Sequence, residues 1–317
     1  MLVVWFILLI VGFVLLVGGA NYFVDGAAAL AKKFHIPGFI IGMTVVAMGT
    51  SAPECAVTIT ASLRGSNGMA ISNVIGSNVF NLLVVCGVCA VITPLMIKKS
   101  TLKREFPVSI VAEAILLVMG FTGLMVGHVE GIILLAAFVV FLVWTVLSAR
   151  KAMRAGEEVG SEEIKEMKNG ICALCIIAGA AAIVIGGQFV VDCAETIALT
   201  FGMSETLVGL TICSIGTSLP ELVTSIIAAR KKQADMALGN VIGSNIFNVL
   251  LVAGLATSIS PIAVTRNNLI DLIFVIAITV YIMVLVWRRQ ELRRGGGISM
   301  LAIYAVYMVY ICMRDMV

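Results

Sequence analysis

The sequence is poor in charged residues and in histidine. Only 12% of its 317 residues are charged and only two are histidine, whereas about 25% of the residues in an ordinary soluble domain are charged. Hydrophobic residues make up 61%, and the mean hydropathy is +1.12. This composition excludes an ordinary soluble globular protein and is typical of a chain that crosses a membrane several times. Because the net charge is only +3, we expect no nucleic-acid partner.

Sequence motifs of hydrolytic enzymes are also missing. The chain contains neither GxSxG nor HExxH, so we predict that it is not an enzyme and uses no cofactor. An intramembrane hydrolase with paired carboxylates is the one enzymatic alternative that stays open. The eight cysteines include the pairs Cys86–Cys89 and Cys172–Cys175, but no histidine lies near either pair. We interpret these cysteines as small buried residues.

Long apolar stretches are abundant. Taking about 20 apolar residues as one crossing of a bilayer, we expect ten transmembrane helices and therefore an all-α polytopic membrane protein. The expected spans are 2–23, 38–62, 69–92, 106–126, 130–149, 170–190, 205–229, 236–259, 268–287 and 297–313. The first run lacks a basic segment before it, so we expect a retained span and not a cleaved signal peptide.

The basic residues gather on one side of these spans. All but three of the 21 lysine and arginine residues lie in odd-numbered connections, and the exceptions are Arg64, Arg266 and Arg314. Cytoplasmic loops are enriched in lysine and arginine. We therefore expect the loop 150–169 to be cytoplasmic and both termini to lie outside. The acidic pairs of this loop indicate a solvated segment, with a regulatory calcium contact as the alternative.

The chain consists of two similar halves. An offset of 167 residues aligns Glu54 with Glu221, and ten of the thirteen residues at 69–81 equal their counterparts at 236–248. Because five spans per half is an odd number, the second half enters the membrane in the opposite orientation. Inverted repeats with interrupted helices are the architecture in which secondary transporters place a site at the membrane midplane. The expected domains are a first five-helix repeat, the cytoplasmic loop and a second five-helix repeat, at 1–149, 150–169 and 170–317.

Two short motifs place a carboxylate and a proline inside apolar spans. They are GTSAPE at Gly49–Glu54 and GTSLPE at Gly216–Glu221. A carboxylate at membrane depth costs several kcal/mol, and proline interrupts the helix and frees a backbone carbonyl. Threonine lies one helical turn before each glutamate and shares its face. The result is a cluster of oxygens suited to a hard cation. The candidate ligands are Glu54, Thr50, Ser51, Glu221, Thr217 and Ser218.

A second pair of motifs places serine and asparagine one helical turn apart. They are NVIGSNVFN at Asn73–Asn81 and NVIGSNIFN at Asn240–Asn248. The alternative is that these side chains only join helix to helix, but their duplication around two carboxylates favours cation binding. We also expect Gly76 and Gly243 to let neighbouring helices approach closely. The candidate ligands are Ser77, Asn81, Ser244 and Asn248.

At these paired motifs, the sequence resembles the sodium/calcium exchanger family of the calcium/cation antiporters, in its prokaryotic type. The resemblance covers essentially the whole chain and places the two alpha-repeat regions at about 39–94 and 206–261. It implies that calcium is held by Glu54, Glu221 and the backbone carbonyls of Thr50 and Thr217. It implies that sodium uses the same glutamates together with Ser51, Ser218, Ser77, Ser244, Asn81, Asn248 and the backbone carbonyls of Ala47 and Ser214.

The resulting prediction is a secondary antiporter that exchanges Ca²⁺ for Na⁺ by alternating access. The Thr-Ser pairs favour sodium, because the proton-coupled branch of the family carries GN(A/T)xE instead. Asn248 stands where potassium-dependent members usually carry aspartate, which argues against potassium coupling. Three alternatives stay open: a Ca²⁺/H⁺ antiporter, an antiporter of another divalent cation, and a cation channel. The expected partners are the two ions and the lipid bilayer, in a prokaryotic inner membrane; the sequence indicates no protein partner.

Overall fold

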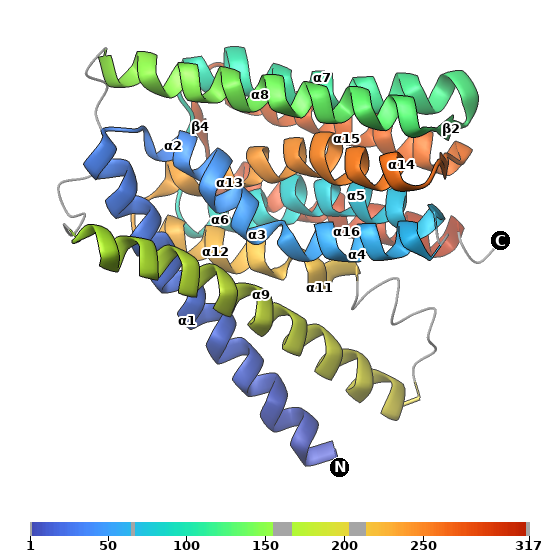
Figure 1. Ribbon diagram of the computed structural model, residues 1–317, viewed down its shortest axis with the longest axis horizontal. Coiled ribbons are helices and arrows are strands. Elements are labelled where there is room, and N and C mark those ends of the chain that lie inside the picture. Colours follow the sequence, from blue (N-terminus) through green and yellow to red (C-terminus); the bar gives the residue numbers. More distant parts are fainter. Residues whose placement is uncertain (1, 65–66, 155–166, 203–213, 315–317) are drawn as a thin grey trace.

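The computed structural model describes residues 2–64, 67–154, 167–202 and 214–314, and almost all of them are helical (Figure 1). Among these residues, eight helices or helical runs are long and apolar enough to cross a membrane. Gly38–Thr50 and Ala52–Leu63 form a pair bent by 48°, which makes nine if the pair is one broken span. This confirms an all-helical membrane fold. The expected seventh span, 205–229, begins outside the described residues, so the count of ten helices stays a prediction.

The two halves have matching orders of elements. The first half contains α1 (Leu2–Phe34), α2 (Gly38–Ile41), the π-helix η1 (Gly42–Val46), α3 (Ala47–Thr50), α4 (Ala52–Leu63), α5 (Asn67–Phe80), the π-helix η2 (Asn81–Val85), α6 (Cys86–Ile92), β1 (Leu95–Met96), α7 (Lys99–Gly123), β2 (Met125–Val126) and α8 (His128–Arg154). The second half contains α9 (Asn169–Thr200), α11 (Ser214–Thr217), α12 (Leu219–Arg230), α13 (Ala234–Phe247), the π-helix η4 (Asn248–Ala253), α14 (Gly254–Ile259), β3 (Ile262–Ala263), α15 (Arg266–Trp287), β4 (Glu291–Leu292) and α16 (Arg294–Arg314).

Helices α1 and α9 lie side by side and cross the other long helices obliquely (Figure 1). Glycines allow their backbones to touch. A methyl group added at Gly19 would lie 2.9 Å from the Gly179 carbonyl oxygen, and one added at Gly186 would lie 2.8 Å from the Gly12 carbonyl oxygen. Close approach through small residues is how helices associate where water cannot drive their burial.

Both of these helices are longer than the spans expected from the sequence. α1 continues to Phe34 and α9 to Thr200, so Asp25 lies inside a helix and not at a span end. The Asp25 carboxylate pairs with the Lys231 ammonium at 2.7 Å, and the same ammonium donates to the Asn21 carbonyl oxygen at 2.9 Å. This ion pair stabilises the carboxylate within the continued helix.

Two short antiparallel strand pairs join the halves. β1 pairs with β4, and β2 pairs with β3. An offset of 167 residues carries β1 onto β3, so each pair contains one strand from each half. The labels β2 and β4 lie at opposite ends of the helices in Figure 1, as expected when one half is inverted relative to the other.

Helix α13 forms the centre of the molecule, and its residues from Met236 to Phe247 are all buried. A methyl group added at Gly243 would lie 2.6 Å from the Met43 carbonyl oxygen. The predicted close approach at this glycine is therefore confirmed. Gly239 is equally tight, because its added methyl group would lie 2.2 Å from the Phe39 carbonyl oxygen.

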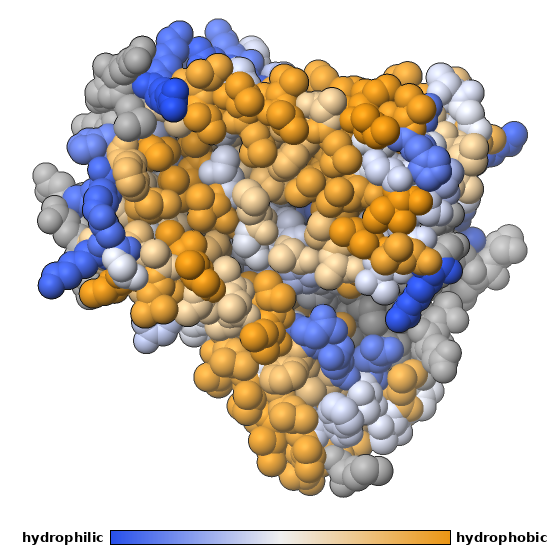
Figure 2. Space-filling model, viewed as in Figure 1, coloured by the Kyte–Doolittle hydropathy of each residue, from blue (hydrophilic) through white to orange (hydrophobic). Residues whose placement is uncertain are grey.

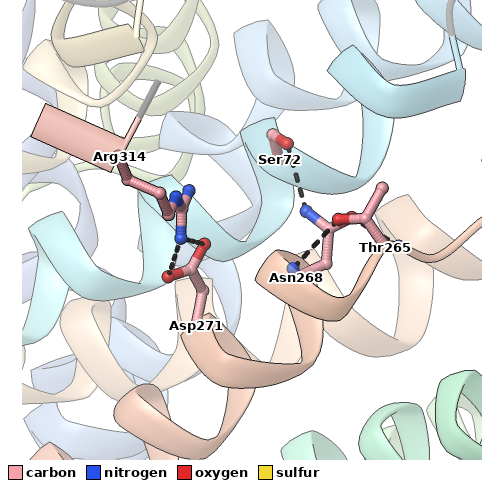
Figure 3. Close-up of polar contacts among 5 residues, drawn as sticks. All are labelled: Ser72, Thr265, Asn268, Asp271 and Arg314. Atoms are coloured by element: carbon pink, nitrogen blue, oxygen red, sulfur yellow. Dashed lines mark hydrogen bonds and ion pairs between the residues drawn. The ribbon is translucent and has the colours of Figure 1, made fainter. Parts of the chain in front are cut away.

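Polar contacts fix the neighbouring helix α15 at two levels (Figure 3). Thr265 and Asn268 form a capping box at its first turn, and the Asn268 amide donates to the Ser72 hydroxyl at 3.3 Å. One turn further along, the Arg314 guanidinium donates to both carboxylate oxygens of Asp271, at 3.0 and 3.2 Å. These bonds tie α15 to α5 and to α16.

The outer surface has the distribution expected for a lipid-exposed protein. In Figure 2 hydrophobic side chains cover the middle of the visible face, and hydrophilic ones gather toward its two ends. Large side chains such as Phe121 and Val140 are 74% and 68% exposed. Apolar exposure on this scale is unfavourable in water and ordinary in lipid.

Candidate functional site

Two helical segments, one in each half, are interrupted at equivalent serines. Ser51 separates α3 from α4 with φ −82° and ψ 9°, and Ser218 separates α11 from α12 with φ −92° and ψ 6°. The breaks expected from Pro53 and Pro220 are therefore present, two residues before each proline. Proline is tolerated in the first turn of a helix, where no N–H is needed, so each break has to precede it.

Each serine at a break contacts the glutamate of the other half. The Ser51 hydroxyl donates to Glu221 Oε1 at 2.9 Å, and the Ser218 hydroxyl donates to Glu54 Oε1 at 3.0 Å. Both glutamates are buried, with exposed fractions of 1% and 0%. The structure thus brings the two sequence motifs, 167 residues apart, into one centre with two-fold pseudosymmetry.

The threonines of the two motifs bond to asparagines of the opposite half. The Thr50 hydroxyl lies 3.1 Å from Asn240 Oδ1, and the Thr217 hydroxyl lies 3.5 Å from Asn73 Oδ1. These hydroxyls therefore join the halves, which leaves the threonine backbone carbonyls as the expected ligands. Sequence reasoning did not assign a role to Asn73 and Asn240, although their identity at the 167-residue offset was the available signal.

Several buried oxygens at this centre have no hydrogen-bond partner among the described residues. Buried polar atoms are normally paired, so this concentration is unusual. Carboxylate, hydroxyl and amide oxygens are also the ligands that hard cations take. The unpaired oxygens are Glu54 Oε2, Glu221 Oε2, Ser77 Oγ, Asn81 Oδ1 and Asn248 Oδ1. Ser244 differs, because its hydroxyl lies 3.5 Å from Glu221 Oε1.

A π-helical turn begins at each of the two candidate asparagines. η2 starts at Asn81 and η4 starts at Asn248, and an α-helix resumes at Cys86 and at Gly254. A π-turn replaces i→i+4 bonding by i→i+5 bonding, which rotates the side chains and loosens the backbone locally, and it is frequent at functional sites. Sequence reasoning placed these residues on regular helices and did not predict the π-turns.

The remaining two candidates are predicted to contribute only backbone atoms. The Ala47 carbonyl already accepts the Ser51 N–H at 2.9 Å, and the Thr50 hydroxyl lies 3.4 Å from the same oxygen, so an ion would compete with this hydroxyl for the second lone pair. Ser214 is the first residue of α11 in the described part of the chain, and its role as a ligand stays a prediction. Within the described ranges, no three His, Cys, Asp or Glu side chains form a group that could hold a metal ion. A centre of two carboxylates and neutral oxygens suits Na⁺ or Ca²⁺ better than a transition metal.

Comparison with known proteins gives consistent matches over the whole chain. The family described as sodium/calcium exchanger protein matches twice, at residues 4–147 and 171–313. The sodium/calcium exchanger MaX1 of Methanosarcina acetivorans is 31% identical over 98% of this chain and 99% of its own length. Inner membrane protein YrbG of Escherichia coli is 36% identical, over 89% of this chain and 88% of its own length.

Solved structures of the sodium-calcium exchanger NCX_Mj have the same fold. One of them superposes with a TM-score of 0.84 at 28% identity, covering 98% of this chain and 100% of that chain. Another, from crystals soaked with Na⁺ and Sr²⁺, gives a TM-score of 0.85 at 29% identity. With two family matches that fall on the two halves, and with relatives that align almost from end to end, this chain belongs to the sodium/calcium exchanger family.

Proposed function

We propose that the chain exchanges Ca²⁺ for Na⁺ across the membrane by alternating access, at the centre built around Glu54 and Glu221. The observation that carries this proposal is the reciprocal arrangement of the two glutamates. Each uses one oxygen to accept a bond from a serine of the opposite half, and each keeps a second, buried oxygen without a partner among the described residues. Carboxylate oxygens that have no protein donor are ligands that a divalent cation such as Ca²⁺ takes.

The same centre explains how the two ions compete. Ca²⁺ takes six to eight oxygen ligands and neutralises two carboxylates by itself. Sodium accepts the same kind of oxygen but carries one charge, so several Na⁺ ions replace one Ca²⁺. An empty centre would expose two buried negative charges in a medium of low dielectric constant, which is costly. The protein therefore switches between its outward-facing and inward-facing conformations most readily when cations are bound. This requirement links the movement of one ion to that of the other.

We further propose the ligand sets implied by the family motifs. Ca²⁺ is held by Glu54 and Glu221 with the Thr50 and Thr217 carbonyls. Sodium uses these glutamates together with oxygens of the serines, the asparagines and the remaining backbone carbonyls. The full set is Glu54, Glu221, Thr50, Thr217, Ser51, Ser218, Ser77, Ser244, Asn81, Asn248, Ala47 and Ser214.

The orientation and domain bounds belong to the same proposal. The chain lies in a prokaryotic inner membrane, with both termini outside and the loop 150–169 in the cytoplasm. The charge asymmetry of the connections supports this orientation. The relative YrbG is named an inner membrane protein, which supports the location. The family matches at 4–147 and 171–313 support a first repeat at 1–149 and a second at 170–317.

Calcium flux in proteoliposomes tests the proposal. Vesicles loaded with Ca²⁺ are diluted into media that impose a Na⁺ gradient or a pH gradient separately, each with and without K⁺. We expect the Na⁺ gradient to drive Ca²⁺ release at fixed pH without K⁺. Vesicles with the double variant Glu54→Gln, Glu221→Gln are the control and should show no exchange. A pH gradient that drives Ca²⁺ equally fast in sodium-free medium would establish proton coupling instead, and flux without any counter-ion would indicate a channel.

A further inference from the structure

A third buried carboxyl group lies close to the proposed site. Glu113 is in the middle of α7 and is 1% exposed. Its Oε1 accepts a hydrogen bond from the Asn78 amide, and its Oε2 has no partner among the described residues. A carboxyl group inside a membrane span is costly, and the proposed ligand sets give Glu113 no task.

Hydrogen bonds connect Glu113 to a proposed ligand through one side chain. Asn78 donates to Glu113 through Nδ2, and its Oδ1 accepts the Nδ2 group of Asn248 at 3.0 Å. The Asn248 Oδ1 atom has no hydrogen-bond partner within the described ranges. The two ends of an amide are a donor and an acceptor. The direction of this chain of bonds therefore decides which end of Asn248 is left for an ion.

Acceptors around Asn78 set that direction. The Asn78 NH₂ group donates to Glu113 Oε1 and also lies 3.3 Å from the Asn245 backbone carbonyl oxygen, so its own oxygen is turned toward Asn248. Asn248 must then turn its NH₂ group toward Asn78. Its oxygen is left on the opposite side, where a cation needs an acceptor. Without the acceptor at position 113, only the longer contact to the Asn245 carbonyl would hold Asn78, and both amides would turn around more readily and present an NH₂ group to the cation.

Among the described residues, this chain of hydrogen bonds has no equivalent at the other asparagine of the centre. Asn81, the repeat counterpart of Asn248, has neither amide atom bonded within the described part of the chain. Asn245, the counterpart of Asn78, donates to the Asn78 backbone carbonyl at 3.3 Å, as Asn78 does to the Asn245 carbonyl. The Asn245 Oδ1 atom, however, has no hydrogen-bond partner among the described residues. Val280, the counterpart of Glu113, is 43% exposed. The two asparagines of the centre therefore differ, and only Asn248 has an amide of fixed orientation.

We propose that Glu113 is a positioning residue that orients the Asn248 amide, through Asn78, so that its oxygen faces the transported Na⁺. This inference rests on the proposed function, and it assigns Glu113 no direct contact with an ion. The required property of Glu113 is a hydrogen-bond acceptor at Oε1, which a carboxyl group offers and an aliphatic side chain does not.

Two substitutions separate this role from others. Glu113→Gln keeps an oxygen that can accept from Asn78, whereas Glu113→Leu has a similar size and no acceptor. In proteoliposomes we expect Glu113→Leu to raise the half-saturating Na⁺ concentration about tenfold, because an amide without its orienting partner loses a buried hydrogen bond. Half-saturating Ca²⁺ and the maximal rate should each change less than about threefold, because Asn248 belongs to the proposed sodium ligands only. Glu113→Gln should stay within about threefold of wild type for both ions.

A double-variant comparison provides the sharpest control. If Glu113 acts only through Asn248, then Glu113→Leu should have less than about a twofold effect on half-saturating Na⁺ in an Asn248→Ala background. Val280→Leu, at the repeat counterpart, is the matched control and should leave the half-saturating concentrations of both ions unchanged.

An equal effect of Glu113→Leu on half-saturating Na⁺ in both backgrounds overturns the inference, as does a Glu113→Gln variant that is as impaired as Glu113→Leu. The glutamine comparison decides the question alone if Glu113→Leu does not fold. Absence of Na⁺-driven Ca²⁺ flux in the wild type contradicts the proposed function itself, whereas an active wild type whose Na⁺ dependence is insensitive to position 113 contradicts this inference only.

Discussion

At the scale of single residues, the two glutamates combine one bonded oxygen with one unbonded oxygen. The serine hydroxyl of the opposite half fixes the side-chain rotamer, since it donates to Oε1 of Glu54 or Glu221 at 3.0 or 2.9 Å. The second oxygen of each carboxylate is buried and has no protein donor among the described residues. A neutral side chain of the same shape should keep the first contact and lose the charge.

Glu54→Gln or Glu221→Gln should therefore abolish Ca²⁺ uptake while the protein still folds. Glutamine can accept the serine hydroxyl, but the remaining single carboxylate cannot neutralise Ca²⁺. We expect uptake below about 1% of the wild-type rate, with a wild-type elution profile in detergent. Asp25→Asn and Asp192→Asn are the controls. Their effects should be milder, because Asp25 pairs with Lys231 and Asp192 accepts from Gln188 on its own helix. Near wild-type uptake by both glutamine variants would place the site elsewhere.

Asn248→Asp should make transport dependent on pH. At low pH the new side chain is neutral and resembles asparagine. At high pH it adds a third negative charge, and it also opposes the Asn78 oxygen that accepts from Asn248 in the wild type. Transport should thus approach wild-type behaviour toward the acidic end of the assay range and depart from it toward the alkaline end. Initial rates of Na⁺-driven Ca²⁺ flux across this range, with the wild type measured in parallel, test the expectation. Equal pH profiles would show that position 248 lies away from the transported ions.

At the scale of secondary-structure elements, the architecture depends on backbone contact between helices. The α1–α9 seam and the α13–η1 contact are both made at glycines, where an added methyl group would lie within 3.0 Å of another backbone. The neighbouring residue on the helix is not equivalent. Gly18 faces open space, with nothing within 4 Å of an added methyl group, whereas Gly19 would place its methyl group 2.8 Å from the Ala182 side chain.

Gly19→Val should destabilise the protein, and Gly18→Val should not. A larger side chain at position 19 must push α1 and α9 apart, because the obstruction includes the Gly179 carbonyl oxygen at 2.9 Å. Overpacking of this kind costs about 1–3 kcal/mol. We expect the midpoint of thermal unfolding in detergent to fall by more than about 3 °C for Gly19→Val and to stay constant for Gly18→Val. Equal midpoints for the two variants would mean that α1 and α9 are not in backbone contact.

At the scale of the whole molecule, two inverted halves share one centre. The strand pairs β1–β4 and β2–β3 each join one half to the other, and the central bonds between serine and glutamate do the same. A site between two inverted halves lies near the membrane midplane. When the two halves exchange conformations, the site can open to one side of the membrane or to the other. The proposed orientation of the chain follows from the basic residues of the connections.

Labelling of single cysteines should find Lys151 and Gly127 on opposite sides of the membrane. In a background without the eight native cysteines, Lys151→Cys should react with a membrane-impermeant reagent from the cytoplasmic side, and Gly127→Cys from the outside. Lys151 is exposed near the end of α8, and Gly127 lies in the connection between α7 and α8. Reaction of both from one side would contradict the topology.

The sequence by itself determined the membrane class, the repeat and the residues of the centre. Apolar runs, prolines and carboxylates within apolar spans can be recognised from short stretches of sequence. Each motif also occurs a second time at a fixed offset, and this second copy supports the interpretation of the first. Glu113 was not predicted as a functional residue, because its repeat counterpart is Val280 and no duplicated motif contains it.

Only the tertiary structure decided which atoms face one another. The bonds from Ser51 to Glu221 and from Asn248 to Asn78 join residues 170 positions apart, and they form because the two halves pack as an inverted pair. The ion pair of Asp25 with Lys231 likewise joins parts of the chain that are distant in sequence. Local propensity cannot specify such contacts, because the free energy of a buried polar atom depends on the partner that packing brings to it.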